Sequence, residues 1–178
     1  MKLLKKKSEL LEDYMRIKYK PKWSVKHIRN GEVIWEDEYN ENILHDEGEQ
    51  FILQVVFDET ASVPANYYVG VDARASLAEE DNLAAVSGEP SGSGYSRQAI
   101  ASSVAGWTIS QVGGNYQAAS ATATFTASGG DWTAVTKMFL ATSSDGSGKL
   151  IASVALSSSR TVLNGDSLTT SLTITLSE

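Results

Sequence analysis

Short segments of alternating apolar and polar residues dominate the chain after residue 66 and predict β-strands. The last segment alternates most clearly, and one of its faces holds Leu168, Thr170, Leu172, Ile174 and Leu176. We expect strands at residues 67–71, 95–100, 107–112, 116–126, 132–141, 149–156 and 167–176, with turns rich in Gly, Asn, Asp and Ser between them. Short strands without intervening helices predict a mainly β protein, an antiparallel β-sandwich or jelly-roll-like domain.

Residues 22–40 predict a β-hairpin, because Asn30-Gly31 is flanked by apolar–polar alternation. We expect a three-residue loop, which pairs Val25 with Trp35 and His27 with Val33. In this register Trp35 packs in the core beside Val25. His27 then lies among apolar side chains, as a buried core residue with no companion that would make it a metal ligand.

A short buried helix is predicted at residues 47–57. Asp46 and Glu49 have the spacing of a capping box, and an apolar face follows at Phe51, Ile52, Val55 and Val56. His45 stands beside Asp46, but adjacent residues at a helix start point in different directions. Capping therefore explains this cluster better than a metal or general-base site. Residues 72–94 form a long connection, of the kind that often carries function or partners.

The first 20 residues predict an amphipathic helix that Pro21 ends, because leucines recur there at helical spacing with charged residues between them. The helix either covers a face of its own domain or docks in a groove on another chain. Nucleic acid and membrane are disfavoured as partners, since no Arg-rich or aromatic-interleaved patch follows. The candidate partner-docking residues are Lys5, Lys6, Lys7, Leu10, Leu11, Tyr14 and Met15.

The predicted organisation is a basic helical arm at residues 1–21 and one β-rich domain at residues 22–178. Within that domain, residues 22–60 form the hairpin and the short helix, and residues 61–178 form the sandwich. The 178 residues suffice to bury a core without cross-links.

Charge is distributed unevenly along the chain, whose net charge is −7. Residues 1–29 carry +7, residues 30–60 carry −10, and residues 61–178 carry −4 and consist largely of Ser, Thr, Ala, Gly and aliphatic residues. A free monomer usually has a more charged surface. The weakly charged part is either the neutral surface of a viral or secreted-style β-domain or a surface that neighbours cover, and it favours a homo-oligomer.

The residue types exclude several kinds of chemistry. The chain has no cysteine and only two histidines, so a thiolate nucleophile is excluded and a multi-histidine metal centre is not expected. The acidic stretch at residues 79–82 lacks the pattern of a calcium loop. No apolar run reaches the roughly 20 residues that a membrane span needs, and no export signal is recognisable. We expect a non-enzyme with no cofactor and no metal.

The remaining pattern is a fixed order of short motifs, namely Trp23-Ser24-Val25, Ile34-Trp35, Asn42-Ile43-Leu44, Gly48, Phe51-Ile52-Leu53, Phe57, Tyr67-Tyr68-Val69-Gly70-Val71, Gly94-Tyr95-Ser96-Arg97-Gln98-Ala99-Ile100 and Thr161-Val162-Leu163-Asn164-Gly165-Asp166-Ser167-Leu168. This order resembles small virion structural proteins of tailed bacteriophages over most of residues 22–178. The resemblance implies a virion component, made in the host cytoplasm. The lysine-rich helix lies outside the resembling pattern.

Three classes of function follow. The leading one is a capsid decoration or cement protein on the capsid surface, which bridges major capsid subunits as a homo-oligomer, with a trimer favoured by the resemblance. The alternative is a neck, tail or head-fibre component with a carbohydrate- or receptor-binding module, in which Trp107, Tyr116 and Trp132 would stack on sugars unless they pack in the core. A glycosidase is the third class, disfavoured because most acids of the β region lie in turns.

Overall fold

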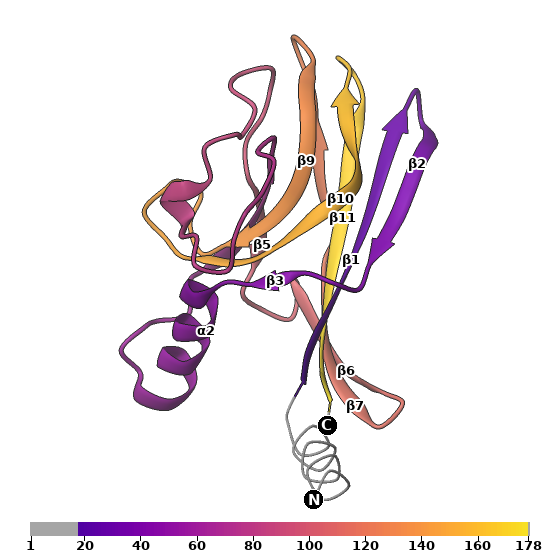
Figure 1. The fold of residues 1–178 in the computed structure, drawn as a ribbon. Helices are drawn as coiled ribbons and strands as arrows, with labels where there is room; N and C mark the ends of the chain where they lie inside the picture. The colour runs from indigo at the N-terminus through magenta and orange to yellow at the C-terminus, as the bar shows by residue number, and fades with distance from the viewer. Residues whose placement is uncertain (1–17, 178) are drawn as a thin grey trace, which may run out of the picture.

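Two antiparallel sheets form the protein, which a computed structural model describes over residues 18–177 (Figure 1). The first sheet has the order β2-β1-β11-β7-β6, with β8 also paired to β11; its strands are β1 (Lys18–Arg29), β2 (Glu32–Tyr39), β6 (Trp107–Val112), β7 (Asn115–Ser120), β8 (Ala123–Thr126) and β11 (Ser167–Ser177). The second has the order β3-β10-β9-β4-β5; its strands are β3 (Ile43–Leu44), β4 (Asn66–Asp72), β5 (Gln98–Ala101), β9 (Trp132–Ala141) and β10 (Leu150–Val162).

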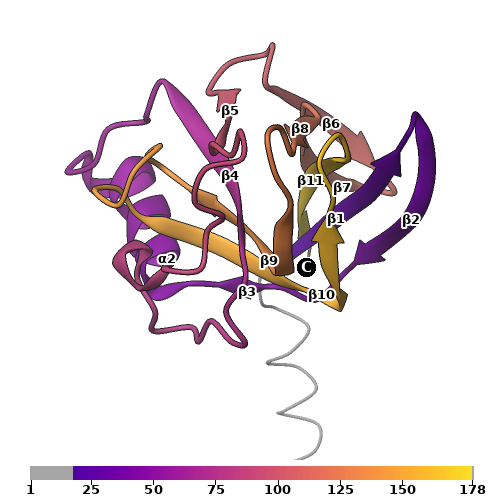
Figure 2. The same ribbon diagram turned by 90° about the horizontal axis from the view of Figure 1, so that it is seen from above.

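The core lies between the two sheets, as the view from above shows (Figure 2). From the first sheet it receives Trp23, Val25, Phe125, Leu168 and Leu172, and from the second Val69, Val71, Met138, Leu140 and Val154. Alternation along each strand sends these side chains inward. The opposite face of the second sheet is also buried in part, because Phe139 and Leu150 form a second apolar cluster with residues of the connection after β4. The predicted mainly β, sandwich-like fold is confirmed.

Most of the expected strands are present, and β6 and β9 have the predicted bounds. The expected strand at 116–126 is two strands, because β7 pairs with residues 173–176 of β11 whereas β8 pairs with residues 167–170. Between β7 and β8 the chain therefore shifts from one part of β11 to another. β10 also continues to Val162, beyond the expected end at residue 156.

The hairpin is confirmed, but the predicted register is wrong. A two-residue turn at Asn30-Gly31 pairs Ile28 with Val33, and one further residue, Ile34, then bulges so that His27 faces Trp35. Val25 consequently lies opposite Asp37 instead of Trp35. A bulge inside a strand changes the pairing beyond it, which turn residues alone do not reveal.

The helix expected at residues 1–20 falls mostly on residues outside the described range. The helix prediction is wrong for residues 18–20, because they belong to β1 and pair with the end of β11. Pro21 does not end a helix but lies buried within this strand, opposite Ile174. Pairing with β2 begins only at Trp23, so β1 has a partner strand on one side at Pro21, where a missing N–H is tolerated.

The short helix is confirmed as α2 (Asp46–Leu53), followed by a π-helical turn (Gln54–Asp58). The predicted capping box is wrong, since His45 is the N-cap residue and its side chain makes no capping hydrogen bond. The helix is buried on one side only: Phe51 packs on the core, whereas Ile52 and Val56 are exposed.

Two sets of hydrogen bonds hold the long connection after β4, one to α2 and one to the residue before β5. Glu47 Oε2 accepts hydrogen bonds from the backbone N–H groups of Leu83, in a short 3₁₀ turn (Leu83–Ala85), and Leu150, at 2.9 and 2.8 Å. Farther along, the Arg97 guanidinium donates to both carboxylate oxygens of Glu89. These contacts make the connection a structural part of the second sheet's edge.

Candidate interaction surfaces

A β-hairpin of β6 and β7 projects from one end of the molecule, beside the C-terminal end of β11 (Figure 1). We call residues 107–120 the arm. The register aligns Ile109 with Ala118 and Ile174, and Tyr116 with Leu176. Residues directly opposite each other in antiparallel strands share a face, so the arm continues the core-facing side of β11.

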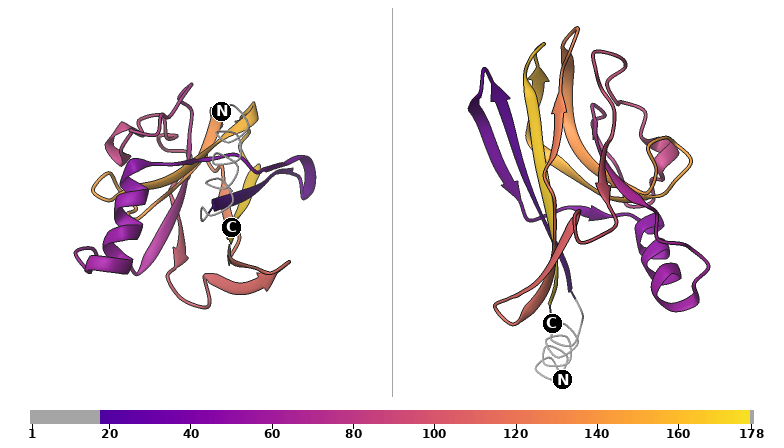
Figure 3. Two further views of the ribbon diagram at one scale, coloured as in Figure 1. Left: turned by 60° about the horizontal axis from the view of Figure 1, so that its bottom comes forward. Right: turned by 180° about the vertical axis from the view of Figure 1, so that it is seen from behind.

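Toward the end of the arm, the second sheet no longer covers this apolar face. Along β11, Leu172 is fully buried, Ile174 is half-buried and Leu176 is 52% exposed. On the arm itself, Ile109 is 67% exposed and Tyr116 is 60% exposed. The two further views show the arm standing clear of α2 and the second sheet (Figure 3). Exposed apolar side chains on one continuous face are typical of an interaction surface.

The arm also lies in the longest part of the chain without charge. Residues 98–130 are 33 consecutive residues with no Lys, Arg, Asp, Glu or His, and they span β5 to β8. The edge strand at the other side of the sheet, β2, is different, because it carries Glu32, Glu36, Asp37 and Glu38. Charged residues protect an exposed strand edge from pairing with other chains, and β6 has none.

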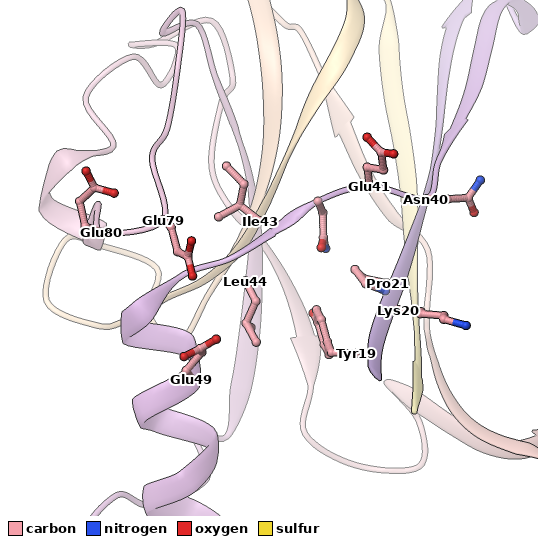
Figure 4. A pocket seen from close by; sticks show the side chains of 11 residues that line it. Tyr19, Lys20, Pro21, Asn40, Glu41, Ile43, Leu44, Glu49, Glu79 and Glu80 are labelled. Atoms are coloured by element: carbon pink, nitrogen blue, oxygen red, sulfur yellow. The ribbon is translucent and has the colours of Figure 1, made fainter. Parts of the chain in front are cut away.

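A second feature is an open groove of about 760 Å³ between the start of β1 and α2 (Figure 4). Its apolar walls include Tyr19, Pro21 and Leu44, and four glutamates line it, namely Glu41, Glu49, Glu79 and Glu80. None of the four forms an ion pair with another described residue. Burial raises the pKa of Tyr19 to about 12, so its hydroxyl stays protonated at neutral pH. Lys20 also lines the groove, so charges of both signs face it.

The three aromatic residues considered for sugar stacking have different surroundings. Trp132 is 2% exposed and donates from Nε1 to the Ser93 carbonyl at 3.0 Å, so it is a core residue. Trp107 is half-buried and packs edge-on against Tyr67, with ring centroids 6.0 Å apart. Tyr116 alone among the three is mainly exposed, which gives no aromatic platform for a sugar.

Both histidines are buried. The sequence predicted burial for His27, but its expected apolar surroundings are a correction, because its ring contacts Asp166 and Arg160. His45 is fully buried between the Ser153 hydroxyl, 2.8 Å from Nε2, and the Glu79 carbonyl, 3.2 Å from Nδ1. Burial lowers the pKa of His45, which favours its neutral form. Among residues 18–177, no group of three or more His, Asp or Glu side chains is placed to hold a metal ion.

All seven candidate docking residues, from Lys5 to Met15, lie outside the described residues. The sequence analysis did not single out the arm. A signal was present, since the uncharged run at residues 98–130 is visible in the sequence. Its exposure was not visible, because that depends on which part of β11 pairs with β7. In the described part of the chain, no helix has the length and apolar character that crossing a membrane requires.

Comparison with known families finds one matching family model. Residues 44–175, from β3 into β11, match the model of the family described as podophage GP4 fiber I protein gp80. The chain belongs to this family. It is therefore a phage virion structural protein, as the motif order indicated. No curated protein matches the chain.

Proposed function

We propose that the chain is a fibre component of a podophage particle and acts there as a structural subunit without enzymatic activity. The observation that carries the proposal is the match of residues 44–175 to a phage fibre family. This favours the alternative from the sequence analysis, a neck, tail or head-fibre component, over a capsid cement protein. The burial of Trp132 and the half-burial of Trp107 speak against a sugar-binding platform, and so favour protein–protein contacts as the subunit's role.

Attachment to the particle is assigned to the N-terminal segment that carries Lys5, Lys6, Lys7, Leu10, Leu11, Tyr14 and Met15. Its pattern combines basic and apolar side chains, which suits an acidic virion partner that offers an apolar groove. Charge attraction of this kind weakens with salt, since exposed charges are screened beyond about 10 Å at 0.1 M ionic strength.

Labelling of particles tests the fibre role against the cement role. Gold-labelled antibody against the folded chain is expected to mark discrete projections on purified particles. Particles that lack the gene product should lose these projections and keep the heat resistance of their capsids. Label spread over the whole shell, together with capsids that break at lower temperature, would instead identify a cement protein.

A further inference from the structure

The arm presents exposed apolar side chains on one face among the described residues, and its charge pattern restricts which partner fits there. Ile109, Tyr116 and Leu176 are each more than half exposed on one face of the sheet. A contact through this face removes apolar surface from water without desolvating any charge. This is the feature expected of a permanent subunit contact, whose centre is depleted of charged residues.

A second copy of the chain fits this face better than the charged parts of the surface do. With a net charge of −7, two copies repel each other, most strongly where acids concentrate, as on β2. The arm lies within 33 uncharged residues, so two arms can meet without bringing like charges together. Copies of this acidic chain can therefore approach each other most closely through their arms.

The chain's own N-terminal segment is the other candidate cover for the arm, and the experiment below distinguishes it from a second copy. The described chain begins with β1, and Tyr19 in β1 already flanks Leu176 on the core-facing side. Ile109 lies three strands away from β1, in the order β1-β11-β7-β6. Ile109 and Tyr116 thus lie on strands that do not pair with β1, whereas Leu176 lies on the strand beside it.

We propose that the arms of neighbouring copies pack together through Ile109, Tyr116 and Leu176 and hold a homo-oligomer. This inference rests on the proposed function in one respect, since a fibre is the setting in which such an oligomer serves. The contact uses the apolar face of the arm, so a charge placed in the centre of that face should separate the copies.

The test is the molar mass of the full chain in solution, measured by analytical ultracentrifugation over a range of concentrations. We expect the unaltered chain at a whole-number multiple, two or more, of its 19.1 kDa mass. Ile109→Lys and Tyr116→Lys should weaken association at least tenfold and yield the 19.1 kDa species. Val33→Lys is the matched control, because it places the same charge at an exposed apolar residue on the opposite edge strand and should leave the oligomer intact.

Hydrogen exchange of residues 107–116 provides a second measurement that does not depend on the folding of a variant. We expect protection of these amides to rise with the fraction of oligomer. Protection that is already complete in the monomer would show that the chain's own N-terminal segment covers the arm, and would overturn the proposal. A chain that stays monomeric, or arm variants that associate as the unaltered chain does, would overturn it as well. Absence of the chain from purified particles would refute the fibre role and leave these results unaffected.

Discussion

His27 and Asp166 are joined by a 2.8 Å hydrogen bond between Nε2 and Oδ2, although 139 residues separate them in the sequence. The same carboxylate accepts from Arg29 Nε at 2.9 Å and from the backbone N–H of Leu163 at 3.0 Å. Arg160 Nη2 lies 3.3 Å from His27 Nδ1 and donates to it, which places the ring hydrogen on Nε2. Asp166 thus joins β1 to the turn that precedes β11.

Asp166→Asn should lower the free energy of unfolding by about 2–3 kcal/mol, because hydrogen bonds from Arg29 and His27 to a charged, buried carboxylate are lost. The Arg29 guanidinium holds the pKa of Asp166 well below its usual range. The stabilisation is therefore fully present above about pH 4, the value in an unfolded chain, and is lost as pH falls toward the folded-state pKa. Urea unfolding at pH 7 and pH 3 measures both effects.

Asp131→Asn is the control for this substitution. Asp131 accepts a hydrogen bond from the Asn164 backbone N–H at an exposed site, and an asparagine oxygen can replace that acceptor. Its effect should stay below about 0.5 kcal/mol, as for most surface substitutions. Equal losses in the two variants would mean that the buried network adds nothing to stability.

His45 should make the protein less stable as the pH falls from 7.5 to 5.5. Burial lowers its pKa in the folded state below the usual 6.5, so the unfolded chain binds the proton more readily. Stability is then lost progressively as pH drops through 6.5. His45→Gln removes the titrating group, and the melting temperature of that variant should change less between these two pH values. Identical changes in both proteins would rule out this role of His45.

Gly48→Ala should destabilise the protein, although alanine is the better helix former. A Cβ at this position would collide with the backbone carbonyl of Ile151 in β10, so α2 would have to move away from the sheet. The cost of such overpacking is about 1–3 kcal/mol, against a propensity gain of about 1 kcal/mol. Gly146→Ala has open space and should be neutral in the same denaturation experiment.

Trp23 and Trp35 lie on neighbouring strands and should differ in their contribution to stability. Trp23 is fully buried, so Trp23→Ala should cost about 3–5 kcal/mol. Trp35 is half-buried, with the Arg160 guanidinium 4.7 Å from its ring centroid, so Trp35→Ala should cost only about 1–2 kcal/mol. Equal losses in thermal or urea unfolding would mean that the burial of the two rings is the same.

The sequence predicts the strands because alternation is a local property, and β6 and β9 were placed correctly for that reason. It did not predict what depends on pairing across long distances. Because Ile34 bulges, Trp35 pairs with His27 instead of the predicted Val25. The separation of β7 from β8 follows from their two separate pairings with β11. Asp166 was expected as a turn residue, since only the fold brings His27 and Arg29 to it.

Composition indicated a weakly charged surface but not its position, and its use by a homo-oligomer stays a prediction. Ile109 and Tyr116 lie within the uncharged residues 98–130, and Leu176 lies in β11. Which part is exposed follows from geometry: Leu172 and Leu176 share one alternating face, yet only the first lies beneath the second sheet. The docking role of the residues from Lys5 to Met15 stays a prediction, because they lie outside the described range.

The number of copies per purified particle tests the central claim, that this chain is a structural fibre subunit of the virion. Quantitative mass spectrometry, with the major capsid protein as internal standard, measures it directly. The account predicts that the chain is present in every preparation, in far fewer copies than the capsid subunit. Copies comparable in number to the capsid subunits would indicate a cement protein, and a chain absent from particles would contradict the account altogether.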